Sequence, residues 1–348
     1  MTKTRGVYFL ANDRLIDMTI AFLNSFRKHN PAIPLCFIPF DDCATQVAAL
    51  AERYQFSIFS NSAALGQCDE ISLQCLGRAN GIYRKLALWE GEFDEFVYMD
   101  ADTVVLASVE FVFDFLADYD FVNSHSNLPH LRQWVWKDSI ESAGRLTAEQ
   151  IAYSANMGFI ASRKEALPLG DVIEKLPAAL ELHPHMELFC KEQPLLNYLF
   201  VTSGRPYTSL LTLWKERGRP REIALERWAG GRIGFVWAGR ILFPRRPRVL
   251  LVHWAGEWQF GKFDDYILSA LRHLGVLGRL RKKAVSTAND RRNSLLNNVA
   301  STVGAASWTG LLACPSLFPQ PDRPRPAMRF FIRHGRLWRH YRNLTWNA

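Results

Sequence analysis

The sequence predicts an α/β fold with a mostly parallel central sheet and helices on both of its faces. Short apolar runs rich in branched and aromatic residues alternate with segments that have apolar residues at helical spacing. Polar residues directly follow three of these runs, at Asn12-Asp13, Asp41-Asp42 and Asp100-Ala101-Asp102. Because ligands bind beyond the carboxyl ends of the strands in such sheets, we expect these residues to lie along one functional edge.

The expected elements follow the chain in alternation. Residues 6–11 are apolar and stop at two polar residues, as a buried strand does. Residues 15–29 have apolar residues at helical spacing and end at Asn30-Pro31, so a helix is expected there. The same criteria predict strands at 35–40, 56–59, 96–99, 119–123, 159–162 and 249–252, and helices at 45–54, 82–89, 109–116, 164–181 and 188–201.

Three segments lack a clear period. Residues 60–80 are polar and are expected to form a loop. Residues 124–155 are rich in His and Trp, and they either cover the functional edge or contribute packing, the second being favoured. Residues 215–248 are basic and interrupted by Gly and Pro. We find no internal repeat.

Length and composition indicate a globular protein. A chain of 348 residues with 48% hydrophobic residues can bury one sizeable core, with room for an appended lobe. Its six cysteines form no C-x-x-C pair, so we expect reduced thiols in a cytoplasmic protein. The N-terminus lacks the apolar region of a secretory signal, and no run of about 18 apolar residues predicts a transmembrane helix.

The charge is distributed unevenly along the chain. The net charge is +8, yet residues 272–348 hold 14 Lys and Arg against only Asp290 and Asp322. The remaining residues 1–271 therefore hold 28 basic and 32 acidic residues. A mildly acidic body with a strongly basic C-terminal segment points to an anionic partner for that segment.

The pair Asp100 and Asp102 follows an apolar run and precedes another. A carboxylate pair at the end of a buried strand is costly unless something neutralises it. A divalent cation would do so, and hard oxygen ligands suit Mg²⁺ or Mn²⁺, which usually carry substrate phosphates as well. An Asp-x-Asp pair also occurs in ordinary turns, so the pair alone leaves both interpretations open.

Six short motifs, taken together and in order, resemble those of the GT-A glycosyltransferases. The resemblance is greatest to family 8, the glycogenin and lipooligosaccharide galactosyltransferase group, and it covers roughly residues 6–270. It implies a Rossmann-like GT-A domain over 1–272, followed by a basic, aromatic-containing helical extension over 273–348. The motifs are Phe9-Leu-Ala-Asn-Asp13, Tyr83-Arg-Lys-Leu-Ala-Leu-Trp89, Tyr98-Met-Asp-Ala-Asp-Thr103, Asn156-Met-Gly-Phe159, Glu192-Gln-Pro-Leu-Leu-Asn197 and His253-Trp-Ala-Gly256.

The resemblance implies a metal site that holds a nucleotide sugar, most often a UDP-sugar. Asp100, Asp102 and His253 would bind Mn²⁺ or Mg²⁺, which stabilises the diphosphate leaving group. Gly256 would let the backbone approach the phosphates, and Lys262 would add a charge there. Phe263-Asp264 follows Lys262 where the family has Pro-Trp, so a solvated surface lysine is an equal alternative.

Further donor-binding residues follow from the same resemblance. Ala11 and Asp13 match the family's Ala-x-Asp, which holds the uracil and ribose, although an aspartate there also suits a helix cap. The family also carries a basic residue that reaches the donor phosphates or the Asp-x-Asp. Lys85 is the favoured match for it, and Arg84 is the alternative. The Asn-x-Gly that faces the donor sugar is matched by Asn156 and Gly158, where the alternative is a plain turn.

The expected catalytic pair is Glu192 and Gln193. It matches the family's Asp-Gln, in which the acid contacts sugar hydroxyls and the glutamine lies near the anomeric carbon. Glutamate in place of aspartate, and Pro194 where the family often has Asp, leave the donor sugar open. Family 8 enzymes retain the anomeric configuration, so retention is expected here.

Residues 328–346 have arginines at steps of three and four, interleaved with aromatic and aliphatic residues. Such a pattern is typical of an interfacial helix on anionic lipid, and bacterial lipid-linked members of the family carry similar tails. A solvated or body-packed helix is the alternative, and nucleic acid is not expected because no nucleic-acid-binding fold accompanies the arginines. A membrane location would make the acceptor a glycan or a glycolipid headgroup.

Two other functions remain open at this point. A sugar-1-phosphate nucleotidyltransferase shares the α/β core and acidic site, but Asn12-Asp13-Arg14-Leu15 lacks the glycine-rich phosphate loop expected after its first strand. A catalytically inactive domain that acts as a membrane scaffold is the other alternative. The presence of Asp100, Asp102 and His253 argues against it.

Overall fold

A computed structural model describes residues 3–228, 235–237, 240–242 and 247–254. The chain forms two compact units. Of the described residues, the larger unit holds 3–226 and Val249–His253, and the smaller unit holds the rest. The described part of the smaller unit contains an antiparallel hairpin of β10 (Phe235–Trp237) and β11 (Arg240–Leu242). The expected extension at 273–348 lies outside the described residues.

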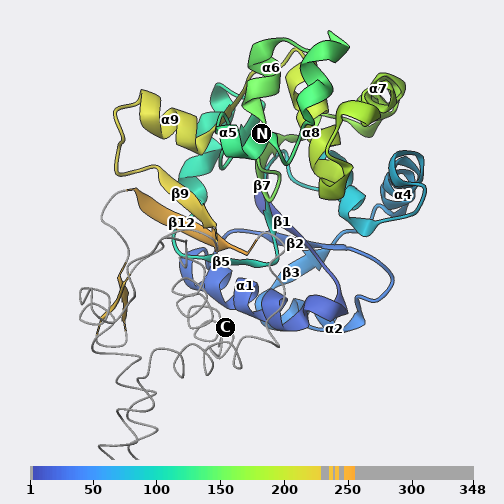
Figure 1. The fold of residues 1–348 in the computed structure, drawn as a ribbon. Helices are drawn as coiled ribbons and strands as arrows, with labels where there is room; N and C mark the ends of the chain where they lie inside the picture. Colours follow the sequence, from blue (N-terminus) through green and yellow to red (C-terminus); the bar gives the residue numbers. More distant parts are fainter. Residues whose placement is uncertain (1–2, 229–234, 238–239, 243–246, 255–348) are drawn as a thin grey trace, which may run out of the picture. The chain divides into compact units, whose positions relative to one another are not determined.

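A seven-stranded sheet forms the centre of the larger unit (Figure 1). Four of its six strand pairings are parallel, and β7 is antiparallel to both of its neighbours, which confirms the predicted α/β fold with a mostly parallel sheet. The strands, in spatial order, are β3 (Phe56–Ile58), β2 (Leu35–Pro39), β1 (Arg5–Ala11), β4 (Glu95–Asp100), β7 (Phe159–Arg163), β6 (Phe121–Asn123) and β8 (Tyr207–Ser209).

A second sheet of three strands has the order β5 (Thr103–Val105), β12 (Arg248–His253) and β9 (Ala224–Trp228). The chain leaves the Asp-x-Asp directly into β5, which pairs antiparallel with β12 so that His253 lies opposite Thr103. This pairing brings a residue about 150 positions away in the sequence next to the end of β4.

Helices lie on both faces of the central sheet (Figure 1). The α-helices are α1 (Ile16–His29), α2 (Thr45–Ala48), α3 (Ala51–Tyr54), α4 (Ser62–Leu76), α5 (Pro129–Arg132), α6 (Ala148–Tyr153), α7 (Leu169–Glu181), α8 (Glu192–Thr202) and α9 (Leu210–Glu216). The 3₁₀ helices are η1 (Asp13–Leu15), η2 (Gly81–Glu90), η3 (Glu110–Ala117), η4 (Asp138–Ala143), η5 (Lys164–Ala166), η6 (His183–His185) and η7 (Leu188–Cys190). In the described part of the chain, no helix combines the length and apolar character needed to span a bilayer.

The alternation of side chains along β1 divides the core between the two faces of the sheet. Val7 and Phe9 pack in one buried cluster with Phe22 of α1. Tyr8 and Leu10 face the opposite cluster, which contains residues of α4, η2, α7 and α8. β1 is therefore buried on both faces, as a central parallel strand is expected to be.

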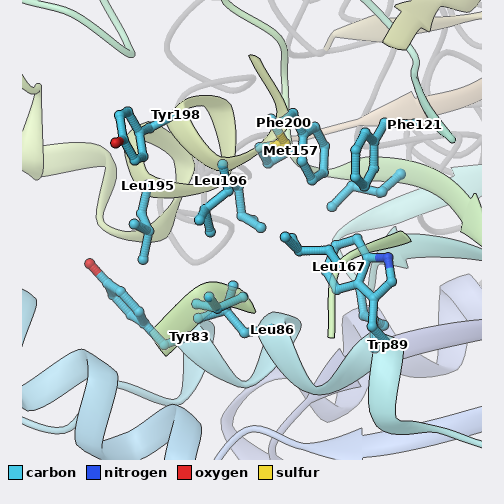
Figure 2. Close-up of a cluster of buried hydrophobic side chains, with 14 of the residues drawn as sticks. Tyr83, Leu86, Trp89, Phe121, Met157, Leu167, Leu195, Leu196, Tyr198 and Phe200 are labelled. Carbon is cyan, nitrogen blue, oxygen red and sulfur yellow. The ribbon is translucent and has the colours of Figure 1, made fainter. Parts of the chain in front are cut away.

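Aromatic stacking dominates the second cluster. Phe121 of β6 and Phe200 of α8 stack with ring centroids 4.1 Å apart, and Trp89 of η2 meets both edge-on (Figure 2). The indole N–H of Trp89 donates a hydrogen bond to Ser162 Oγ, so its polar atom is satisfied inside the core. This packing joins η2 to α8, and both helices carry candidate site residues.

The prediction of a loop over 60–80 is wrong. Residues 62–76 form α4, which Asn61 caps by accepting a hydrogen bond from the Ala64 N–H. Gly77, with φ of 68°, ends the helix. The buried apolar residues of α4 are spaced by four, three and four positions, which is a helical period. They are Ala64, Cys68, Ile71 and Cys75, and the polar residues between them obscure the period.

Other expected boundaries shift. The helix expected at 45–54 divides into α2 and α3, and those expected at 82–89 and 109–116 are the 3₁₀ helices η2 and η3. The helix expected at 164–181 begins as α7 only after Pro168. The strands β8 and β9 were not expected. All five described cysteines are free thiols, and three of them, Cys36, Cys68 and Cys75, are buried.

Candidate active site

Asp100, Asp102 and His253 converge at the edge where β4 and β12 end. His253 Nε2 lies 3.2 Å from Asp102 Oδ1 and 3.6 Å from Asp100 Oδ2. One ligand atom from each of the three residues falls within 4.8 Å of the others. Two carboxylates one residue apart in one motif and a histidine from a distant strand thus form the cluster that the family resemblance implied.

Gly158, at the start of β7, leaves the space that this cluster needs. A Cβ at this position would lie 2.3 Å from His253 Cε1 and 2.9 Å from Asp100 Oδ2. Any other residue would force the imidazole or the carboxylate to move. The glycine in Asn-x-Gly is therefore required by the close approach of His253, and the simple turn interpretation does not account for it.

The three residues fit a hard divalent cation. They supply two carboxylates and one imidazole, a donor set that Mg²⁺ and Mn²⁺ accept. Asp102 and His253 are buried, while Asp100 keeps 21% of its side chain exposed and so remains open to a ligand. Burial alone would lower the pKa of His253, but the carboxylates of Asp102 and Glu226 outweigh it and raise this pKa well above its ordinary value.

Lys85 is the basic residue that reaches the cluster. It is 2% exposed, and its Nζ lies 3.0 Å from Asp100 Oδ1 and 2.7 Å from Glu192 Oε1. Burial would lower the pKa of this ammonium, but the two carboxylates raise it, so Lys85 stays charged. Arg84 instead pairs with Asp69 of α4 at 2.7 Å, so of the two basic residues Lys85 is the one beside Asp100.

Asp100 has its two oxygens assigned to different partners. The Tyr98 hydroxyl donates to Oδ1 at 2.5 Å, on the same side as Lys85. Burial and the Asp100 charge raise the pKa of Tyr98, so the phenol remains a proton donor. Oδ2 is left to face His253, which is the orientation a shared cation requires.

Glu226 is a site residue that the sequence analysis missed. This buried residue of β9 accepts a hydrogen bond from His253 Nδ1 at 2.6 Å, and the Asn156 amide donates to both of its oxygens at 3.0 Å. Burial alone would raise the pKa of Glu226, but the histidines His253 and His125 hold it well below its usual range. The surrounding segment is basic and Gly/Pro-broken, and nothing in its pattern marks this residue.

Asn156 is fixed at both ends of its amide. Its Nδ2 donates to Glu226, and its Oδ1 accepts from the Gly158 N–H at 3.1 Å. The side chain is buried and holds the backbone of Gly158 in place, while its expected role of facing the donor sugar stays a prediction.

Glu192 and Gln193 begin α8 next to the metal-ligand cluster. Glu192 is buried against Lys85, and burial raises its pKa although Lys85 opposes this. Gln193 Nε2 donates to the Trp134 carbonyl at 3.0 Å, and its Oε1 accepts from the Met157 N–H at 3.3 Å. Lys191, in a positive-φ conformation at 55°, turns the chain into this helix.

The first-strand residues lie at the same sheet edge. Leu10 pairs with Asp100, so Ala11 and Asp13 follow at the carboxyl end of β1. Asp13 Oδ1 accepts from the Val47 N–H in the first turn of α2 at 3.0 Å. The helix that follows Asp13, α1, has no side-chain cap, so Asp13 does not cap the next helix. Gly256 and Lys262 lie outside the described residues.

No protein-family model matches the sequence, and no curated protein matches it. Among solved structures, the chain is similar to the WbbM bifunctional glycosyltransferase, with 13% identity, a TM-score of 0.48, and coverage of 74% of this chain and 46% of that one, so it spans less than half of WbbM. It is similar to the galactosyltransferase LgtC with 15% identity and a TM-score of 0.46, over 72% of this chain and 87% of that one. It is similar to mouse xyloside xylosyltransferase 1 with 11% identity and a TM-score of 0.45, over 72% of this chain and 96% of that one. All three similar structures are glycosyltransferases.

Proposed function

We propose that this chain is a metal-dependent GT-A glycosyltransferase that moves a hexose from a nucleotide sugar, expected to be a UDP-sugar, to a glycan or glycolipid. One observation carries the proposal. Asp100, Asp102 and His253, from the ends of two different strands, offer ligand atoms within 4.8 Å of one another beside a glycine that makes room for them. The order of the sequence motifs around them supports the same activity.

The proposed metal, Mn²⁺ or Mg²⁺, would be held by Asp100, Asp102 and His253 and would stabilise the negative charge of the departing diphosphate. The protein's own residues prepare this site. Tyr98 and Lys85 orient Asp100, and Lys85 keeps a positive charge buried beside the cluster. Ala11, Asp13, Asn156, Gly158, Gly256 and Lys262 are proposed to contact the donor.

We propose that Glu192 and Gln193 act on the donor sugar with retention of configuration. In this proposal Gln193 stabilises the oxocarbenium-like transition state, and no protein nucleophile is required. The hydrogen bonds of Gln193 to Trp134 and Met157 would hold its amide still while it does so. Single Glu192→Gln and Gln193→Ala variants, incubated with donor and analysed by mass spectrometry, test this. A glycosyl adduct on Glu192 of the wild type would contradict it.

A thermal-shift panel tests the function directly. Wild-type protein is heated with UDP-, GDP-, CDP- and ADP-sugars, each with and without Mn²⁺. Since a ligand that binds only the folded state raises the melting temperature by mass action, at 100 times Kd the native state gains about 2.7 kcal/mol. We expect a Mn²⁺-dependent increase with the UDP-sugar that is absent in Asp102→Ala.

Asp118→Ala is the matched control. Asp118 is exposed and precedes β6 at the sheet edge opposite Asp100, so this variant should respond as the wild type does. Slow hydrolysis of the UDP-sugar by wild type would exclude the inactive scaffold. Pyrophosphate release from a nucleoside triphosphate and a sugar phosphate would instead indicate a nucleotidyltransferase. No shift with any nucleotide sugar would contradict the proposed function.

We further propose that the basic C-terminal segment holds the enzyme at the inner face of a membrane from the cytoplasmic side. Its arginines and aromatic residues at 328–346 support this proposal. An acceptor attached to a lipid would then meet the active site at the membrane surface.

A further inference from the structure

We infer that Glu226 is a positioning residue that fixes the tautomer of His253 and the orientation of Asn156, so that one buried carboxylate sets both the metal ligand and the neighbouring amide. This inference rests on the proposed metal site. It adds to that site a residue from β9 that none of the motifs contains.

The contacts of Glu226 define its role. His253 Nδ1 is 2.6 Å from Glu226 Oε1, while His253 Nε2 faces Asp100 and Asp102. A carboxylate can only accept hydrogen bonds, so Nδ1 must carry the proton. Nε2 is then the nitrogen that would give up its proton and offer its lone pair to a bound cation. A carboxylate that accepts from the far nitrogen of a metal-binding histidine orients the ring and makes it a stronger ligand.

The same carboxylate sets Asn156. Because both Glu226 oxygens accept from Nδ2 at 3.0 Å, the amide oxygen is directed to the Gly158 N–H. Gly158 in turn lies against His253 and Asp100. Glu226, Asn156, Gly158 and His253 therefore form a closed series of contacts. Displacing Glu226 would remove the contacts that hold His253 and Asn156.

Ser124 also contacts the Glu226 carboxylate. Its hydroxyl donates to Glu226 Oε2 from the end of β6, and His125 Nδ1 lies 3.9 Å from the same oxygen. At least three donors therefore converge on one carboxylate. A glutamine at position 226 has one oxygen in place of two, so an amide N–H would face one of those donors.

Mn²⁺ binding measures this role without relying on turnover. The unbound Mn²⁺ signal in electron paramagnetic resonance gives the affinity of wild type, Glu226→Gln, Glu95→Gln and His253→Gln. Loss of an outer-shell partner typically costs 10–100-fold in metal affinity, and we expect a loss of this size for Glu226→Gln. Glu95→Gln is the matched control, because Glu95 is a buried carboxylate at the opposite end of β4, paired with Lys3 and Arg5. Its affinity should stay within threefold of wild type.

The outcomes separate the two proposals. Wild-type affinity in Glu226→Gln, with weakened binding in His253→Gln, would overturn this inference and leave the metal site standing. Equal and negligible binding in wild type and His253→Gln would overturn both. If Glu226→Gln does not fold, the wild type decides: nuclear magnetic resonance of the ¹⁵N-labelled imidazoles with Cd²⁺ bound should show His253 protonated at Nδ1. Protonation at Nε2 would overturn the inference.

Discussion

Gly158 leaves the space in which the candidate metal ligands meet, and its replacement should damage the site more than the fold. In Gly158→Ala the new methyl group would lie 2.3 Å from His253 Cε1, so the imidazole must move. We expect at least a tenfold loss of Mn²⁺ affinity, measured by calorimetric titration.

Gly66→Ala is the control for this substitution. Gly66 lies inside α4, where a Cβ built on it would meet no heavy atom of the described chain within 4 Å apart from its chain neighbours and the backbone of its own helix. Alanine should stabilise this helix by about 0.5–1 kcal/mol and leave metal binding unchanged. Unaltered Mn²⁺ affinity in Gly158→Ala would mean that the cation does not bind between His253 and Asp100.

Lys85 is the residue whose loss should cost most in both stability and activity. Removing one member of a buried ion pair leaves an uncompensated charge, which typically costs about 3–5 kcal/mol. Lys85→Met would leave Glu192 buried without its ammonium. Urea unfolding should show a loss of this order, and Lys85→Met/Glu192→Gln should recover part of it. A double variant less stable than Lys85→Met would contradict this account.

Arg27 is a buried charged residue that connects secondary-structure elements. It joins α1 to the end of α3 and to the loop that follows α1. Its buried guanidinium donates to the carbonyls of Tyr54, Ile33 and Gln55, each at 2.7 Å. Burial lowers its pKa to about 10, so it remains charged at neutral pH. Hydrogen bonds from a charged donor are each worth about 1.5–3 kcal/mol.

Arg27→Met would leave these carbonyls without their donor, and we expect a loss of about 3 kcal/mol or more in the free energy of unfolding. Arg14→Met is the control, since that side chain is 73% exposed and its pair with Asp41 is a surface contact worth about 0–1 kcal/mol. Chemical denaturation of both variants makes the comparison. Equal losses would show that the buried hydrogen bonds contribute little.

Elements whose pattern is local were predictable from the sequence. β1, β2 and β4 are apolar runs that stop at polar residues, so both their existence and the edge at which they end followed directly. α4 has its helical period carried by alanine and cysteine among polar residues, and the period was overlooked. β8 and β9 are short, and their stability comes from pairing with distant strands rather than from their own composition.

The candidate site was predictable to the extent that motifs carried it. Asp100, Asp102 and His253 were expected to converge, and their convergence required only that β12 pair with β5. The choice between Lys85 and Arg84 depended on which face of η2 is buried, a fact that tertiary packing supplies. No sequence pattern marks Glu226 as a site residue, because its role depends on hydrogen-bond partners 27 to 102 residues away in the chain.

At the scale of the whole molecule, charge is the property that distinguishes one end of the chain. Residues 272–348 have a balance of +12, from 14 basic and two acidic residues, while the rest is mildly acidic. A polybasic segment near an anionic membrane gains about 1 kcal/mol per Lys or Arg, and this gain falls with ionic strength. Binding to vesicles should therefore depend on lipid charge and on salt.

Flotation of the full-length chain with phosphatidylserine or phosphatidylcholine vesicles measures this. Replacing five arginines of the segment with glutamine should weaken binding to the anionic vesicles by about a thousandfold or more, because roughly 1 kcal/mol is lost per charge. The five are Arg329, Arg333, Arg336, Arg339 and Arg342. A control removes the same charge from exposed positions of the body, at Arg14, Arg53, Arg78, Arg145 and Arg217. If the two variants lose binding equally, net charge alone explains attachment and the segment has no special role. If only the first loses it, the arginines of this segment attach the protein to the membrane, and the acceptor is best sought among membrane glycolipids.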